Sequence, residues 1–561
     1  LRNRNIKVVG AGIETTIIDG NQANYVFQIE FASDATLAGM TIQNGAGYMG
    51  GAVTCIESAV TLKDLKITNN TAYPGGGGVY GYNASLDIDN VTFLGNHSGN
   101  YAGGLLAGRS GAFNPAIYGP ITTISITNSL FEGNTADSTI GGAYLYGYDL
   151  DSVNVTISNT VFRGNSSPYY SGLRVQGVSA LIEDCVFELN EADRYGAAGV
   201  FSSGASATVS RTQVLNNAAD LAGEGHNSGG FSVWNGANVN FDRCTFVGNS
   251  ASTGSALTVG KAATATIINS NFWDNGYDLL AVNSADTTGT TLSVSYSNVT
   301  GGADSVTVSD ADAILNWGSG NIDANPLFVD ADNGDYHLTA DSRLIDTGHP
   351  DSTDADGSIA DMGAYYYDQA GQPVRVSNLI ATPAADNVSV RWNANSDAAS
   401  YNIYRSTDGS ADFYSLSPYT TGSDTSYVDE TAEDNTTYHY RVSAVDSESD
   451  EGILAYADHG RRGDDTTALS MGADDRWISV SEPRAPVFSA EQDYTLEFYF
   501  RPLGYGNEAQ TMLRAASLSL DLIPIGSDSF KIHLVDESGS FTGGTPFPIE
   551  SGWLRLAVTA P

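Results

Sequence analysis

Aromatic residues in the first half of the chain form one set of side chains that could do chemistry. Between residues 80 and 234 they recur at alternate positions of short extended segments. Aromatic rings can cover the apolar faces of sugars, while their polar tips bond to hydroxyl groups. The alternative is that the rings stack on one another, stiffen the protein or dock a neighbouring domain. The candidate ligand-binding residues are Tyr80, Tyr82, Tyr144, Tyr146, Arg174, Gln176, Phe201 and Trp234.

Aspartates at short spacings form the second set. The stretches 330–335 and 351–357 place carboxylates around glycines, and another aspartate follows a few residues later. Oxygen ligands at such spacings resemble the loops that bind calcium. Acidic loops are more commonly plain solvated turns, which is the alternative reading. If a cofactor is bound, we expect it to be structural calcium at Asp354, Asp356 and Asp361.

A catalytic pair is harder to find. Proton transfer needs a positioned base, and Arg174 is the one basic residue among the ligand-binding candidates, with no carboxylate cluster beside it. Glu224 and His226 lie in one insertion, and Asp149 and Asp151 lie in another, where polar residues are usually solvated. We therefore predict no catalytic residue, and the sequence leans away from an enzyme.

A long repeat must position these side chains. Eight times an apolar residue is followed three positions later by asparagine, at spacings from 25 residues (Asn165 to Asn190) to 38 residues (Asn96 to Asn134). Such a period is typical of a solenoid, in which each unit buries its apolar face against its neighbours. Stacked asparagines can donate to and accept from one another, so a ladder is expected. The eight asparagines are Asn70, Asn96, Asn134, Asn165, Asn190, Asn217, Asn249 and Asn275.

A second strand follows each asparagine after a pair of small residues, such as Gly103-Gly104 or Gly141-Gly142. The first and third residues after the pair are aliphatic or small, so this parity should face inward. The opposite parity carries the aromatic candidates and should meet water. Contiguous exposed aromatic surface is typical of a contact site. More tyrosines recur in the turn before the pair: Tyr48, Tyr73, Tyr101, Tyr169, Tyr170 and Tyr195.

This pattern resembles the right-handed parallel β-helix of the pectin-lyase-like superfamily over residues 1–370. The motifs Asn325-Pro-Leu-Phe-Val-Asp330, Ser342-Arg-Leu-Ile-Asp-Thr-Gly348 and Asp361-Met-Gly-Ala-Tyr365 look like the closing segment of secreted bacterial proteins of the choice-of-anchor Q type. The resemblance implies that residues 326–368 cap the open end of the solenoid. It also implies a rival function, since lyases and hydrolases of this class act on polysaccharides.

Two further modules are expected after the solenoid. Residues 371–455 resemble a fibronectin type III β-sandwich, with Trp392 in the core and Tyr438 as a candidate tyrosine-corner residue. Residues 456–561 resemble part of a concanavalin A-like or laminin-G-like jelly roll. The predicted fold class is therefore all-β, a right-handed parallel β-helix solenoid followed by two β-sandwich modules.

Composition limits the partners. The 561 residues carry 65 acidic against 25 basic side chains, a formal net charge of −40, which disfavours nucleic acid and anionic membrane surfaces. No stretch is long and apolar enough to span a bilayer. Cys185 and Cys244 stand where other units have serine or threonine, so we expect small core residues and not reactive thiols. We expect a secreted or cell-surface bacterial protein that binds glycans or extracellular matrix and mediates adhesion; the alternatives are a polysaccharide-active enzyme and a structural subunit that contacts other surface proteins or itself.

Overall fold

The computed structural model is built almost entirely from β-strands. It describes residues 2–560 except 110–121, 148–152, 220–227, 253, 277–278, 283–288, 309–312, 385, 410, 435, 463–493, 501–509, 516–517, 525–528, 537–538, 543–546 and 549–553. Within these residues the helical elements are three short 3-10 helices, η2 (Gly302–Ser305), η3 (Ala331–Asn333) and η4 (Phe413–Ser415), and none could cross a membrane. The chain folds into two compact units, Leu1–Asp368 and Gln369–Pro561. The division between them lies two residues before the predicted end of the solenoid at residue 370.

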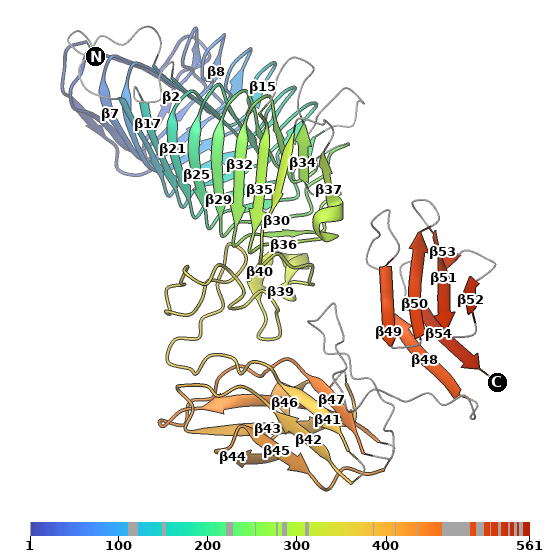
Figure 1. Cartoon of the computed structure of the whole chain (residues 1–561). Coiled ribbons are helices and arrows are strands. Elements are labelled where there is room, and N and C mark those ends of the chain that lie inside the picture. The colour runs from blue at the N-terminus through green and yellow to red at the C-terminus, as the bar shows by residue number, and fades with distance from the viewer. Residues whose placement is uncertain are drawn as a thin grey trace. The chain divides into compact units, whose positions relative to one another are not determined.

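The first unit is a parallel β-helix whose coils stack along one axis (Figure 1). Its longest sheet has twenty strands. They are β1 (Lys7–Val9), β2 (Ile17–Asp19), β4 (Ala35–Gln43), β7 (Ala59–Thr68), β10 (Ser85–Leu94), β13 (Thr122–Thr127), β14 (Leu130–Glu132), β17 (Val153–Ser158), β18 (Val161–Arg163), β21 (Ser179–Glu183), β22 (Val186–Glu188), β25 (Ser206–Ser210), β26 (Gln213–Leu215), β29 (Asn238–Asp242), β30 (Thr245–Val247), β32 (Thr264–Ile268), β33 (Asn271–Trp273), β35 (Thr291–Ser295), β36 (Asn298–Val299) and β38 (Ile314–Trp317).

Two other parallel sheets complete each coil. The short sheet contains β5 (Ala46–Gly47), β8 (Thr71–Ala72), β11 (His97–Ser98), β15 (Thr135–Ala136), β19 (Ser166–Ser167), β23 (Glu191–Ala192) and β27 (Ala218–Ala219). The eleven-stranded sheet contains β3 (Phe27–Glu30), β6 (Val53–Ile56), β9 (Val79–Tyr82), β12 (Leu105–Gly108), β16 (Ala143–Tyr146), β20 (Leu173–Gln176), β24 (Gly199–Ser202), β28 (Phe231–Val233), β31 (Leu257–Gly260), β34 (Leu279–Val282) and β37 (Val306–Val308).

A buried asparagine ladder runs through the corner between the long and the short sheet, as predicted. Asn96 Nδ2 donates to Asn134 Oδ1 at 3.0 Å, and Asn134 Nδ2 donates to Asn165 Oδ1 at 3.0 Å. The same pattern links all eight asparagines, from Asn70 to Asn275. Each coil is therefore fixed in register to the next by side chains as well as by the backbone.

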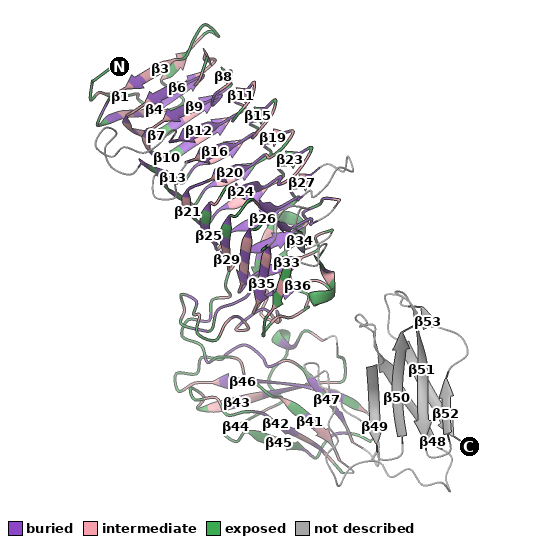
Figure 2. Ribbon diagram, turned by 45° about the horizontal axis from the view of Figure 1, so that its top comes forward, coloured by how far each residue is buried: buried purple, intermediate pink, exposed green. Residues whose placement is uncertain are grey.

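The interior between the sheets is one continuous apolar core, shown as buried in Figure 2. The anchors before the asparagines stack along the axis: the ring centroids of Phe93 and Phe131 lie 4.4 Å apart, and those of Phe131 and Phe162 lie 4.8 Å apart. The small pairs allow this close approach, because a Cβ on Gly104 would lie 2.7 Å from the Gly142 carbonyl oxygen. Repetition of the same packing thus builds the core coil by coil.

A row of hydroxyls inside the long sheet accepts backbone N–H groups from the preceding coil. Ser129 Oγ, for example, accepts a hydrogen bond from Val91 N at 3.1 Å. Cys185 and Cys244 occupy the same row and are buried, as predicted, and burial raises the pKa of each thiol to about 12. Both thiols therefore remain protonated at neutral pH and poorly nucleophilic.

Residues 326–368 lie along the side of the β-helix instead of closing its end. The hairpin of β39 (Phe328–Asp330) and β40 (Asp335–Leu338) places Tyr336 in an apolar cluster with Leu215 and Val247 on the long sheet. Farther along, Ala364 N donates to Thr245 Oγ1 at 2.9 Å. The core-facing residues of the last coil stay only partly buried. These contacts therefore do not form a cap over the open end of the β-helix.

The second unit begins with a seven-stranded antiparallel β-sandwich. One sheet contains β41 (Ile380–Pro383), β42 (Val388–Arg391) and β45 (Ser426–Asp429); the other contains β43 (Ser400–Ser406), β44 (Thr420–Gly422), β46 (Thr437–Val445) and β47 (Asp458–Arg461). Trp392 and Tyr438 are both in the core between them. Glu433 N donates to the Tyr438 hydroxyl at 3.4 Å, the backbone contact expected of a tyrosine corner.

Beyond residue 462 the structure describes only strand positions. β48 (Tyr494–Phe500) pairs with β54 (Leu554–Ala560), and β49 (Gln510–Ala515), β50 (Leu518–Pro524), β51 (Ser529–Asp536), β52 (Gly539–Thr542) and β53 (Phe547–Pro548) form a second antiparallel sheet. The sandwich runs through β47, past the boundary predicted at 455, and the jelly roll expected over residues 456–561 stays a prediction.

Candidate binding surface

Two columns of side chains point outward from the eleven-stranded sheet, one residue per coil. Strand register aligns Tyr80, Leu106, Tyr144 and Arg174 in the first column. In the second column it aligns Tyr82, Gly108, Tyr146, Gln176 and Ser202. The structure therefore brings most of the predicted binding residues together on the outer side of one sheet.

The outer residues pack into an apolar cluster of their own, separate from the core. Tyr80 and Leu106 are buried there against Ala102 and Ile140, which come from the turns before the strands. Tyr82, Tyr144 and Tyr146 are half-buried in the same cluster. The expectation that Tyr80 meets water is wrong, because only 6% of its surface is exposed. Burial raises the pKa of Tyr80 to about 12 and also raises that of Tyr146.

Arg174 is held by two rings and an amide. Its guanidinium carbon lies 4.6 Å from the Tyr144 ring centroid and 5.3 Å from that of Tyr170. Gln176 Oε1 accepts hydrogen bonds from Arg174 Nη2 and from the Tyr144 hydroxyl, each at 2.7 Å. Through these contacts the Arg174 guanidinium packs within the outer cluster and stabilises it.

Phe201 does not belong to this face. It pairs in register with Val175, and its neighbour Val200 pairs with Arg174, so Phe201 points inward and is buried in the core. The prediction that Phe201 lines the outer surface is therefore wrong. The strand begins one residue earlier than expected, because the small pair of this coil is Ala197-Ala198 and Gly199 is the first strand residue.

Tyr146 and Trp234 lie over glycines of adjacent coils. The Tyr146 ring leaves no room for a Cβ on Gly108, and the Trp234 ring leaves none on Gly260. Lys261 lies 5.5 Å above the Trp234 ring centroid. Both rings cover bare backbone on the sheet, which favours the structural alternative for these two residues.

Four of the six tyrosines in the turns are exposed, and the other two are half-buried. We call Tyr48, Tyr73, Tyr101, Tyr169, Tyr170 and Tyr195 the tyrosine ridge. Each follows a strand of the short sheet, and four are open to solvent: Tyr48 by 73%, Tyr73 by 64%, Tyr101 by 40% and Tyr169 by 39%. The recurrence of tyrosine in these turns is visible in the sequence, but strand alternation gave no reason to rank the turns above the strands.

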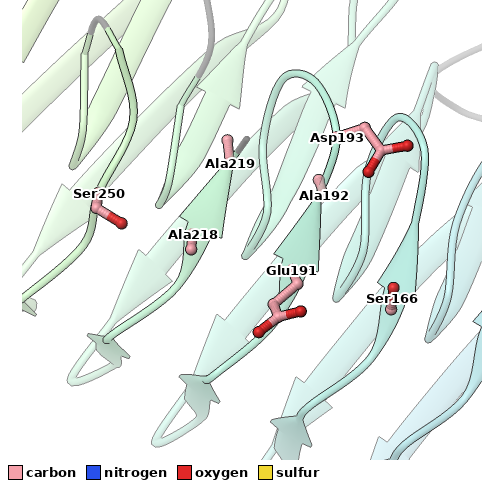
Figure 3. Close-up of a pocket in the computed structure, with 7 residues that line it drawn as sticks. All are labelled: Ser166, Glu191, Ala192, Asp193, Ala218, Ala219 and Ser250. Atoms are coloured by element: carbon pink, nitrogen blue, oxygen red, sulfur yellow. The ribbon is translucent and has the colours of Figure 1, made fainter. Parts of the chain in front are cut away.

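A shallow hollow lies on the short sheet beside this ridge (Figure 3). It has a volume of about 330 Å³ and crosses strands β19, β23 and β27. Carboxylates, hydroxyls and alanines line it: Ser166, Glu191, Ala192, Asp193, Ala218, Ala219 and Ser250. Such a hollow can accept hydrogen bonds but does not enclose a small molecule.

Acid–base chemistry lacks a partner on the outer columns. Along the described strands from β3 to β31, Glu30 is the one carboxylate that register places in these columns, five coils away from Arg174. Glu224, His226, Asp149 and Asp151 lie outside the described residues. Among the residues that the structure does describe, no group of three histidine, cysteine or acidic side chains could hold a metal ion.

The predicted calcium residues organise the backbone of the 341–368 segment. Asp361 accepts hydrogen bonds from Asp346 N and Tyr367 N, and Asp354 accepts one from Asp361 N, all at 2.7 Å. Asp356 instead accepts from Ser358. Burial raises the pKa of Asp361 to about 8 and also raises that of Asp354. Calcium binding here stays a prediction. The role that the geometry shows for Asp354 and Asp361 is to accept hydrogen bonds from backbone N–H groups.

Comparisons with known proteins agree with the coil-on-coil stacking. Residues 122–325 match a protein-family model described as a right handed beta helix region. The first unit is thus a right-handed parallel β-helix. A solved structure titled as a Fn3-like protein from Clostridium thermocellum shares 26% identity, and the match covers 16% of this chain and 95% of that chain with a TM-score of 0.15. No curated protein matches the chain.

Proposed function

We propose that the β-helix is the binding part of a secreted, modular surface protein that holds glycans or extracellular matrix and mediates adhesion. The observation that carries this proposal is the row of exposed tyrosines at Tyr48, Tyr73, Tyr101 and Tyr169. Solvent-exposed aromatic surface of this extent is uncommon unless it serves a contact. The proposal moves the site from the strand face to the tyrosine ridge, because the rings on the strands are largely used in packing.

A rigid scaffold supports a binding role. The asparagine ladder and the stacked phenylalanines fix the spacing between coils, so the turns that carry the ridge are in place before any ligand arrives. Preorganised side chains lose little conformational entropy on binding. Tyrosine adds apolar area and a hydroxyl, which suits a sugar with one apolar face and a polar edge.

The rival reading, a lyase or hydrolase of the pectin-lyase-like class, finds less support. Such an enzyme would need an acid and a base within reach of one bond. The outer columns of the described strands offer Arg174, but its guanidinium is stacked between Tyr144 and Tyr170 and bonded to Gln176. We propose instead a pectin-lyase-like scaffold of the choice-of-anchor Q type whose main role is binding.

The remaining modules fit the same proposal as spacers or additional binding units. We propose a fibronectin type III domain that begins near residue 371 and extends past the predicted boundary at 455 to the end of β47, supported by its three- and four-stranded sheets and by the Tyr438 contact. We propose a laminin-G-like module after it, supported by the sequence alone. The formal net charge of −40 favours neutral extracellular partners over nucleic acid.

The test is retention on insoluble glycans. We expect the full chain to bind at least one polysaccharide of a cell-wall and matrix panel, and the combined Tyr48→Ala, Tyr73→Ala, Tyr101→Ala and Tyr169→Ala variant to lose at least tenfold in affinity. Tyr366→Ala, at a similarly exposed tyrosine outside the ridge (39%), is the matched control and should bind normally. Normal retention of the fourfold variant would reject the ridge as the binding site.

A further inference from the structure

We propose that the tyrosine ridge takes an extended, uncharged polysaccharide chain that lies along the axis of the β-helix and meets one coil after another. This inference rests on the proposed glycan binding and adds the orientation and the chemical class of the ligand. It follows from the register of the turns, the length of the ridge and the charges that border it.

The turns that carry the ridge are locked together by backbone hydrogen bonds. Isolated parallel bridges join Gly76 to Ala102, Ala102 to Ile140 and Ile140 to Tyr170. Tyr101 and Tyr169 each come directly before a bridged residue, so they occupy the same column two coils apart. The Ile140 N–H donates to the Tyr101 carbonyl at 2.9 Å, which fixes this position between them.

At two places a ring of the ridge packs against the next coil. Tyr73 lies over Gly99 of the next coil and leaves no room there for a Cβ. At the other end, Tyr195 stacks against Tyr169 and Tyr170, with centroids 6.2 Å and 5.7 Å apart. The coil that carries Thr139 interrupts the tyrosines once. The ridge is therefore a row along the axis and not an isolated cluster.

The length of the ridge suits a chain molecule. Tyr48 follows β5 and Tyr195 follows β23. Five steps between adjacent strands of the short sheet separate these two strands. At roughly 4.8 Å per step, this is about 24 Å. A single sugar ring would meet one or two tyrosines, whereas an oligosaccharide several units long would meet all the coils of the ridge.

Charge selects against a polyanion. The carboxylates of Asp137, Glu191 and Asp193 border the ridge; the Asp137 carboxylate lies 3.7 Å from His97 Nε2, and the side chain of Asp137 is 67% exposed. Glu191 and Asp193 also line the hollow of Figure 3, where they can accept hydrogen bonds from sugar hydroxyls. A uronate or sulfate chain would be repelled by these groups and by the net charge of −40, while an uncharged chain would not.

The experiment is isothermal titration of the full chain with two uncharged series, β-1,4-linked glucose and β-1,4-linked N-acetylglucosamine, from one to six units. Oligogalacturonates of the same lengths form the anionic arm. We expect at least one uncharged series to gain tenfold or more in affinity between two and five units, with less than a twofold change between 50 and 500 mM salt. Tyr101→Ala and Tyr169→Ala should each weaken binding of the six-unit ligand about fivefold. Tyr101→Phe, which keeps the ring and loses only the hydroxyl, should weaken it less than Tyr101→Ala, and Tyr366→Ala should leave it unchanged.

The other outcomes separate this inference from the proposed function. Equal affinity for one and six units, or tighter and salt-dependent binding of oligogalacturonate, would overturn the inference and leave glycan binding standing. No binding of either uncharged series would overturn the inference, and the retention panel would then decide whether glycan binding survives. Length-dependent binding that the tyrosine variants do not alter would overturn the inference, because the ridge would not be the site, while glycan binding itself would stand.

Discussion

Leu189 shows how strongly one backbone position is constrained in every coil. It lies in a corner of the long sheet with a φ of 55°, in the left-handed region that residues with a Cβ rarely adopt. The corresponding corners of adjacent coils use Gly164, with a φ of 58°, and Asn216, with a φ of 52°. Glycine and asparagine tolerate this conformation, whereas leucine is strained there.

Replacing Leu189 by asparagine should therefore stabilise the β-helix. Leu189 is 53% exposed, so little buried apolar surface is lost, and relief of the left-handed strain should raise the free energy of unfolding by about 1 kcal/mol. The measurement is urea unfolding of both proteins. Leu181→Asn, at an exposed leucine within strand β21, is the control and should not stabilise. A lower midpoint for Leu189→Asn would contradict the argument from strain.

At the residue scale, the sequence predicted interior side chains better than exterior ones. The anchors, seven of the eight asparagines and the two cysteines of the hydroxyl row are buried as expected, because the core repeats the same environment from coil to coil. Phe201 was misplaced because Ala197, Ala198 and Gly199 are all small and leave the start of the strand undefined. Tyr80 was misplaced because its cover comes from the turns, which strand alternation does not describe.

The asparagine ladder is the element that joins consecutive coils most directly. Asn165 accepts hydrogen bonds from Asn134 N and Nδ2, and donates from its own Nδ2 to Phe131 O and Asn190 Oδ1. All of these groups are buried. An interruption at one rung leaves donors and acceptors without partners in the coils on both sides.

Asn165→Ala should destabilise the β-helix by about 3 kcal/mol. The substitution leaves several buried polar groups without hydrogen-bond partners, and each unsatisfied group costs roughly 1 to 3 kcal/mol of stability. Asn154→Ala, at an exposed asparagine of strand β17, should change the stability by less than about 0.5 kcal/mol. Chemical denaturation of the two variants provides the comparison. Equal stability of Asn165→Ala and the parent protein would mean that the ladder is not a stabilising element.

The segment 341–368 is an element held by buried carboxyl groups, and its stability should depend on pH. Burial raises the pKa of Asp361 to about 8, above its ordinary value of 3.8. The folded state thus binds this proton more tightly than the unfolded state, so stability falls as the pH rises from about 4 to about 8. Above about pH 8 the Asp361 carboxylate is ionised and buried, which lowers the free energy of unfolding.

Asp361→Asn tests this sign. We expect the parent protein to lose more stability between pH 5 and pH 8.5 than the variant, although the variant is less stable at pH 5 because its amide can accept at one position only. Urea midpoints at the two pH values are sufficient. Parallel pH profiles for the two proteins would show that Asp361 does not titrate in this range.

For the whole molecule, the sequence predicted the solenoid architecture far better than it predicted which side chains lie on the surface. The solenoid follows from a repeat of anchors, asparagines and small pairs, and each feature has a packing reason that applies in every coil. The side of the long sheet that binds residues 326–368 was not predictable, since those contacts join segments more than a hundred residues apart, such as Thr245 and Ala364. The exposed part of the aromatic region likewise depends on how the turns fold over the strands.

Hydroxyl-radical footprinting of tyrosines in the full chain tests the central claim most directly, because it reports which rings meet water. We expect rapid labelling of Tyr48 and Tyr73, slow labelling of Tyr80, and protection of Tyr48, Tyr73 and Tyr101 when a retained glycan is added. Labelling of Tyr80 as fast as Tyr48, or unchanged labelling of the ridge in the presence of bound glycan, would contradict the account.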